Sequence, residues 1–114
     1  MTRRFRLRAA RRLREREFEE AGTALAAATA ALREAEERRL SLHTALTVGG
    51  RSVRPPTVSA GTLRDAEALQ QGALHRQRLR AELEEATTEV AARHERVATA
   101  RGAWTEAKAR LRAV

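Results

Sequence analysis

Residues 48–61 read VGGRSVRPPTVSAG, and this stretch divides the chain into two parts. It holds both prolines of the protein and three of its six glycines. A proline inside a helix removes a backbone hydrogen bond and clashes with the preceding turn, and glycine weakens a helix by its conformational freedom. We therefore expect a turn over about 48–61, with Gly49 and Gly50 ending the helix that precedes it.

On both sides of this turn the composition favours long helices. Alanine, leucine, arginine and glutamate dominate, and all four are strong helix formers. The sequence predicts a first helix over about 4–47 and a second over about 62–112, in one domain covering 1–114. Thr62, followed three residues later by Asp65, resembles a capping box for the second helix, although Ser59 could equally supply the cap.

Apolar residues recur in both predicted helices at alternating steps of three and four, the heptad of coiled coils. We call these positions the seam. In the first helix the seam reads Phe18, Ala21, Leu25, Ala28, Leu32, Ala35, Arg39, Leu42 and Leu46. In the second it reads Leu69, Gly72, Arg76, Leu79, Leu83, Ala86, Val90, Arg93, Val97, Ala100, Trp104, Ala107, Leu111 and Val114. The predicted fold is all-α, an antiparallel two-helix coiled-coil hairpin.

The register of such a hairpin follows from size matching across the seam. In an antiparallel pair, facing residues have numbers that add up to a constant, and a constant of 111 sets large residues opposite small ones in several layers. Ala28 then faces Leu83, and Leu7 faces Trp104 near the open end. We expect this register.

The composition also bounds the chemistry. Only 3% of the residues are aromatic and 33% are charged, so a thin seam replaces a thick core and offers no concave site for a small substrate. There is no cysteine, which excludes disulfides and thiolate chemistry and fits a reducing compartment such as the cytoplasm. No apolar run approaches the ~20 residues that span a bilayer. We expect no enzyme, no cofactor and no membrane-spanning segment.

The histidines and the clustered glutamates do not change this expectation. His43, His75 and His94 fall at different heights along the predicted hairpin, so they form no metal site. Six glutamates near one another are expected to set register and solubility rather than to catalyse. These are Glu34, Glu36, Glu37, Glu82, Glu84 and Glu85.

The net charge of +8 has a location. Seven arginines lie within the first fourteen residues with no acid among them, whereas the remaining 100 residues carry 16 basic and 15 acidic residues. Positive charge at a helix N-terminus opposes the helix dipole, at a cost of a few tenths of a kcal/mol per charge. The guanidinium group pairs well with carboxylates and phosphates, so we expect an acidic partner at this end.

With these residues described, the chain resembles the FliJ family, the central stalk of the flagellar type III protein-export ATPase. The opening Phe5-x-Leu7, followed by Leu13, Arg14 and Glu15 and an alanine-rich heptad helix, is similar to the family pattern. So is the end of the chain, AWTEAKARLRAV at 103–114. The resemblance implies a non-enzymatic stalk whose paired ends insert into a hexameric export ATPase and promote its assembly and turnover.

The resemblance also implies which residues meet which partner. The end that enters the ATPase ring would comprise Arg3, Arg4, Phe5, Arg6, Leu7, Arg8, Arg11, Arg12, Arg14, Trp104, Lys108, Arg110, Leu111 and Arg112. The end near the turn would contact the export gate, a membrane protein, through Leu42, His43, Leu46, Leu69 and Gln70. Export chaperones are further partners of the family. A cytoplasmic location, peripheral to the inner membrane, is implied, in a flagellar or a related type III system.

Two other classes remain open. A basic helix leading into a coiled coil is also typical of basic-zipper DNA-binding proteins. The break at 48–61, the lack of a base-reading asparagine in the basic segment and the lack of interleaved aromatic residues disfavour that class. A secreted helical hairpin of the WXG type has about this length, but the turn here holds Pro55 and Pro56 in place of a Trp-x-Gly motif.

Overall fold

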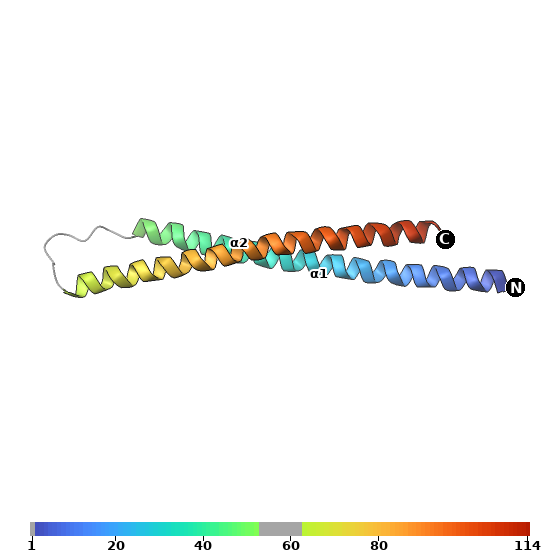
Figure 1. Ribbon diagram of the computed structural model, residues 1–114, viewed down its shortest axis with the longest axis horizontal. Coiled ribbons are helices and arrows are strands. Elements are labelled where there is room, and N and C mark those ends of the chain that lie inside the picture. Colours follow the sequence, from blue (N-terminus) through green and yellow to red (C-terminus); the bar gives the residue numbers. More distant parts are fainter. Residues whose placement is uncertain (1, 53–62) are drawn as a thin grey trace. The chain divides into compact units, whose positions relative to one another are not determined.

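The computed structural model describes residues 2–52 and 63–114, which form two long helices (Figure 1). Helix α1 spans Thr2–Ser52 and helix α2 spans Leu63–Arg112. The prediction of an all-helical fold with two long helices is confirmed. The second helix lies within one residue of its expected bounds, and the proposed caps at Ser59 and Thr62 lie outside the described residues.

Helix α1 continues past the point where the glycines were expected to end it. It includes Gly49 and Gly50 and reaches Ser52, rather than stopping at about 47. No described glycine has a positive φ, so none adopts the left-handed conformation that caps a helix. A glycine costs a helix only about 1 kcal/mol, which the flanking helix formers can offset. The expectation that Gly49 and Gly50 terminate the helix was therefore wrong.

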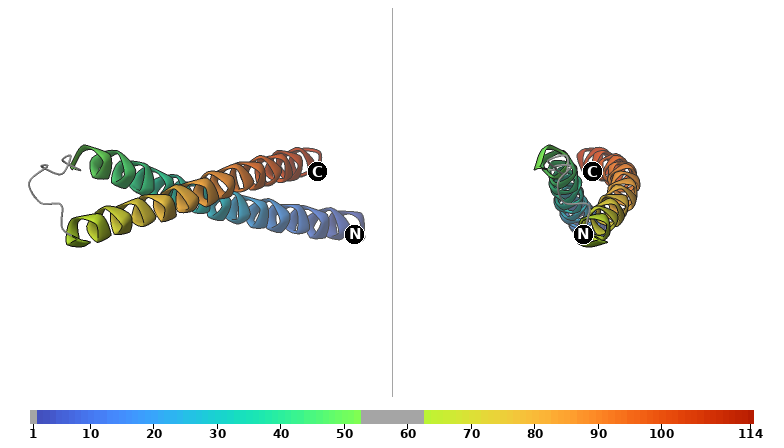
Figure 2. Two further views of the ribbon diagram at one scale, coloured as in Figure 1. Left: turned by 60° about the vertical axis from the view of Figure 1, so that its left-hand side comes forward. Right: turned by 90° about the vertical axis from the view of Figure 1, so that its left-hand side faces the viewer.

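The contacts within the chain define two units. Unit 1 combines Met1–Glu34 with Ala91–Val114, and unit 2 is Ala35–Val90. Each unit contains one segment of α1 beside one segment of α2, running in opposite directions (Figures 1 and 2). Each unit is therefore an antiparallel helix pair with its own interior.

The interior of unit 1 is the predicted seam. Val97 and Ala107 are buried on α2, and Trp104 and Leu111 are half-buried between and beyond them. On α1 every seam position of this unit is half-buried, namely Phe18, Ala21, Leu25, Ala28 and Leu32. The heptad interpretation is confirmed for these residues.

The interior of unit 2 follows the same rule over a shorter stretch. Ala35, Ala86 and Val90 are buried, and the leucines at 42, 46, 79 and 83 are half-buried. Three predicted seam residues, Arg39, Leu69 and Gly72, are instead exposed. The seam of α2 thus begins at about residue 76, not at 69.

The register differs from the one expected. The ring of Trp104 lies 5.5 Å from the ring of Phe18, between centroids, and 3.7 Å from the position a Cβ atom would take on Gly22. The residue numbers of these two contacts add up to 122 and 126. The seam position between Phe18 and Gly22 is Ala21, so Trp104 faces Ala21 and the constant of the observed register is 125. The expected constant of 111, with Trp104 opposite Leu7, was wrong by two heptads.

A constant of 125 also describes unit 2. One surface groove in this unit is lined by Arg39, Leu40 and His43 from α1 and by Leu83 and Thr87 from α2. The groove therefore brings residues 39–43 together with residues 83–87, whose numbers add up to between 122 and 130. Leu69 would then face residue 56, beyond the end of α1 at Ser52, which is why it stays exposed.

Charge explains why the observed register is preferred over the expected one. A constant of 125 sets Lys108 and Arg110, near the end of α2, beside Glu17 and Glu15. The groove lined by Glu17, Glu20, Ala21, Ala103, Glu106, Ala107 and Arg110 places these segments together. A constant of 111 would instead set the same basic residues beside the first arginines of α1. Heptad periodicity alone cannot distinguish the two registers, because seam residues face seam residues in both.

Gly22 offers a test of the Trp104 contact. A Cβ atom added there would lie 3.7 Å from Trp104 Cδ1 and Nε1, an ordinary van der Waals distance. We expect Gly22→Ala to raise the free energy of unfolding by about 1 kcal/mol through helix propensity. Thermal unfolding followed by circular dichroism at 222 nm measures this change.

Gly102→Ala is the matched control, because nothing lies within 4 Å of the Cβ atom it would add. It should stabilise the protein to the same extent. A loss of stability in Gly22→Ala alone would show that Trp104 needs more room than this contact describes.

Candidate functional site

Helix α1 extends past the end of α2 in unit 1. The last residue of α2, Arg112, faces residue 13 when the constant is 125. Residues 2–12 of α1 therefore have no segment of α2 beside them, and we call them the overhang. The N-terminus lies beyond the C-terminus along the helix pair in Figure 1. At ~1.5 Å per residue the overhang is about 16 Å long.

The overhang exposes both apolar and basic side chains. Phe5 is 76% exposed and Leu7 is 55% exposed, so two large apolar side chains lie among the arginines of one short segment. The side chains of Thr2, Arg4, Phe5, Arg6 and Arg8 line a surface depression. Because all its walls come from a single helix, this depression suits contact with a partner surface rather than enclosure of a small molecule.

The basic charge is concentrated at the tip of the overhang. Arg3, Arg4, Arg6 and Arg8 are exposed, and the nearest acidic residue along the helix, Glu15, follows Arg8 by seven residues. At ~1.5 Å per residue this separation is about 10 Å. No carboxylate on the same helix is therefore within reach of these four guanidinium groups.

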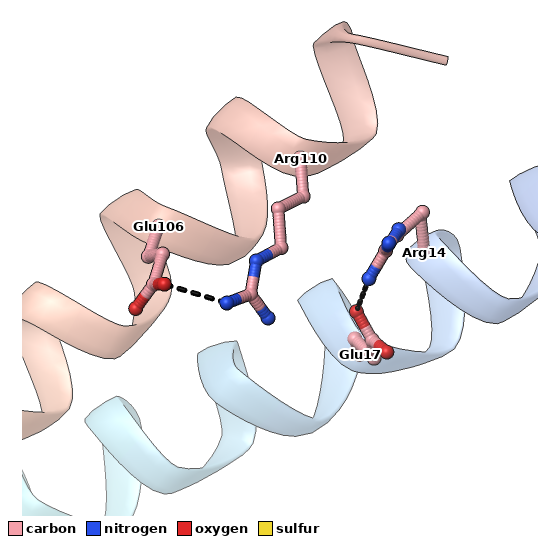
Figure 3. A network of polar contacts seen from close by, with 4 residues as sticks. All are labelled: Arg14, Glu17, Glu106 and Arg110. Carbon is pink, nitrogen blue, oxygen red and sulfur yellow. Dashed lines mark hydrogen bonds and ion pairs between the residues drawn. The ribbon is translucent and has the colours of Figure 1, made fainter.

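At the base of the overhang the arginines have carboxylate partners. Arg11 Nε donates to Glu15 Oε1 at 3.3 Å, and Arg14 Nη1 donates to Glu17 Oε2 at 2.9 Å. On α2, Arg110 Nη2 donates to Glu106 Oε1 at 2.6 Å. Figure 3 shows the Arg14 and Arg110 pairs on adjacent helices. Each such surface pair contributes a few tenths of a kcal/mol to the stability of the fold. The pairs therefore orient these side chains but stabilise the fold only slightly.

The residues expected to enter an ATPase ring do not form one surface. Arg3, Arg4, Phe5, Arg6, Leu7, Arg8, Arg11 and Arg12 lie on the overhang, Arg14 at its base, and Arg110 and Arg112 at the end of α2. Trp104 and Lys108 lie elsewhere, beside Phe18 and Gly22, with Lys108 Nζ 5.0 Å from the centroid of the Trp104 ring. Leu111 is half-buried on the seam. Trp104 and Leu111 are thus packing residues, and Trp104 does not lie opposite Leu7 as expected.

The residues expected to contact an export gate lie in unit 2 and divide in the same way. Leu42 and Leu46 are half-buried on the seam, where they pack between the helices. His43, Leu69 and Gln70 are exposed, and His43 lines the groove with Arg39, Leu40, Leu83 and Thr87. Only the exposed three are available to a partner in this structure.

Leu40 and Leu74 are surface features that the sequence prediction did not single out. They are 65% and 50% exposed. Both are large apolar residues at positions off the heptad seam, and this off-seam placement is the signal that could have identified them.

Neither a metal site nor a membrane span is found among the described residues. In 2–52 and 63–114 no three histidine, aspartate or glutamate side chains gather closely enough to hold a metal ion. Within the same ranges, neither helix has a stretch apolar enough to cross a bilayer.

Comparison with known proteins does not identify a family or a function for this chain. No protein-family model matches the chain, and no match was found among curated proteins or solved structures. The chemistry of the overhang therefore carries the functional interpretation.

Removal of the apolar side chains of the overhang should leave the fold intact. Because Phe5 is 76% exposed, we expect Phe5→Ala to change the free energy of unfolding by less than about 0.5 kcal/mol. Val97→Ala, at a buried seam position, should cost roughly 1–3 kcal/mol. Urea unfolding monitored by circular dichroism measures both. Equal losses in the two variants would mean that Phe5 packs inside the protein rather than projecting from it.

Proposed function

We propose that this protein is a non-enzymatic stalk or adaptor of a type III protein-export apparatus. In this proposal the overhang of α1 docks into an acidic opening of the hexameric export ATPase and promotes its assembly and turnover. The protein acts in the cytoplasm, peripheral to the inner membrane. The resemblance of the sequence to the FliJ family suggests this particular partner.

The observation that carries the proposal is the overhang itself. It is a single helix whose tip bears four exposed arginines, with no carboxylate within reach on the same helix. The helix dipole disfavours positive charge at this end, by a few tenths of a kcal/mol per residue. An external carboxylate surface would remove that penalty and would pair with the planar guanidinium groups in bidentate fashion.

The apolar side chains of the overhang add to this fit. Phe5 and Leu7 project among the arginines and are the largest apolar groups there. Interfaces depend on a few aromatic and arginine anchors placed together, with charged neighbours that steer the encounter. A partner opening with an acidic rim and an apolar interior would accommodate both kinds of side chain.

The corrected register narrows which residues take part in the docking. The overhang supplies Arg3, Arg4, Phe5, Arg6, Leu7, Arg8 and Arg12, while Arg110 and Arg112 approach its base from α2. Trp104 and Lys108 contribute indirectly, by holding the helix pair together. A contact with the export gate or with export chaperones would then involve exposed residues of unit 2, including His43, Leu69 and Gln70.

The proposal is tested by ATPase stimulation and binding with matched charge variants. The purified protein should raise the ATP turnover of the cognate export ATPase. The variant Arg3→Gln, Arg4→Gln, Arg6→Gln and Arg8→Gln should bind the ATPase about tenfold more weakly or worse. It should remain folded, because these arginines are exposed and oppose the helix dipole.

The control variant removes four arginines from unit 2, by Arg38→Gln, Arg64→Gln, Arg78→Gln and Arg80→Gln, all at exposed positions. It has the same net charge and should keep turnover and affinity within about twofold. Equal losses in both variants would show a dependence on net charge alone. Binding of duplex DNA at physiological salt, without stimulation of turnover, would replace the proposal with nucleic-acid binding.

A further inference from the structure

The seam of each helix is longer than the stretch over which the helices pair. In unit 1 the heptad steps continue from Phe18 through Arg14 and Arg11 to Leu7, which is 55% exposed. In unit 2 the steps on α2 continue from Arg76 through Gly72 to Leu69, which is 44% exposed. Apolar seam positions without a partner are thus present on α1 in one unit and on α2 in the other.

The heptad repeat allows these positions to be covered. If one helix shifts by seven residues along the other, each seam residue again faces a seam residue. The apolar contact between the helices is therefore kept. Size matching also survives in two layers of unit 1, because Ala21 would face Val97 in place of Trp104, and Phe18 would face Ala100 in place of Ala107. The constant of such a register is 118, and the displacement along the axis is ~10 Å.

We propose that the helix pair has a second register with this constant, in which α2 covers most of the overhang. Leu7 then faces Leu111, and in unit 2 Leu69 faces Gly49. Arg112 moves from residue 13 to residue 6, so only residues 2–5 remain without a neighbour. The regulatory consequence rests on the proposed function: the register sets how much of the docking helix is available to a partner.

Two features of unit 1 hold the observed register. Trp104 lies against Phe18 and beside Gly22, which has no side chain. After a shift of seven residues the ring would instead meet Arg11 and Glu15. Trp104 is the only tryptophan, so this packing preference is not repeated in another layer.

The second feature is charge. In the observed register the end of α2 lies beside an acidic stretch of α1, with Glu17, Glu20 and Arg110 lining one groove. In the second register Arg110 would face Arg8, and Lys108 would face Ala10, the neighbour of Arg11. Repulsion between exposed charges is screened as ionic strength rises, because the Debye length falls from ~10 Å at 0.1 M salt to ~3 Å at 1 M. Salt should therefore favour the second register.

The chain between the helices is long enough for both registers. In the observed register Ser52 faces residue 73, which lies ten residues, or ~15 Å, from the start of α2 at Leu63. In the second register Ser52 would face residue 66, which leaves about 5 Å. Ten residues reach as far as ~33 Å, so neither register is excluded by length.

Cysteine pairs distinguish the registers directly, since the protein has no cysteine of its own. Leu25→Cys with Ala100→Cys reports the observed register, and Leu25→Cys with Arg93→Cys reports the second. Leu25→Cys with Arg96→Cys, off the seam, gives the background. Initial rates of disulfide formation are measured on the full chain, in 0.05 M and 0.5 M salt.

We expect the 25/100 pair to form fastest in the otherwise unaltered protein. A minor state populated at about 1–10% would make the 25/93 pair ten to a hundred times slower. Trp104→Ala, and separately 0.5 M salt, should raise the 25/93 rate about tenfold and leave the 25/96 rate unchanged. Val97→Ala is the control, because it loosens the seam without removing Trp104.

The 25/93 disulfide should also slow tryptic cleavage after Arg6 and Arg8 several-fold relative to the 25/100 disulfide, because α2 covers them. The inference is overturned if the 25/93 rate stays at the 25/96 background in Trp104→Ala at 0.5 M salt while helicity is retained. It is equally overturned if Val97→Ala raises the 25/93 rate as much as Trp104→Ala does. No export ATPase enters these measurements, so their failure is distinct from failure of the proposed function.

Discussion

The packing of one aromatic ring against a residue without a side chain determines the alignment of the helices in unit 1. Trp104 lies 3.7 Å from the Cβ position of Gly22 and 5.5 Å, centroid to centroid, from Phe18. Two other layers of this seam, Leu25 with Ala100 and Ala28 with Val97, combine alanine with leucine or valine, and small-large layers of this kind recur in registers that differ by seven residues. The tryptophan layer breaks this equivalence. The overhang exists because this layer places Arg112 beside residue 13. In the register with a constant of 111, α2 would instead have reached past the start of α1.

The fold class and the seam could be predicted from the sequence, whereas the register and the helix end could not. Heptad spacing identified Ala35, Val90, Val97 and Ala107, which are buried in the structure, because the periodicity of a helix is a local property. The free energies of two registers differ only by small terms, and here the Trp104 layer and the charges at the end of α2 make the difference. Gly49 was read as a helix stop on propensity alone, although its cost is about 1 kcal/mol and a long helix offsets it.

The candidate site was predicted in part for the same reason. The arginines of the first fourteen residues are visible in the composition, and the structure confirms that Arg3, Arg4, Arg6 and Arg8 are exposed. Trp104 and Lys108 were assigned to the same surface through the resemblance, and the structure places them beside Phe18 instead. Basic charge and apolar exposure together on one helix support the proposal that the overhang binds a partner, and charge density alone would not have separated it from a solvated helix end.

The single-helix overhang also determines how unit 1 responds to force. A partner that pulls on the overhang along its axis loads α1 alone, so the force reaches α2 as shear distributed over the layers from Phe18 onward. In shear the seam contacts resist together, whereas pulling the two helices apart sideways would break them one layer at a time. A helix that leaves the pair along its own axis therefore forms a mechanically strong attachment even though each layer contributes little.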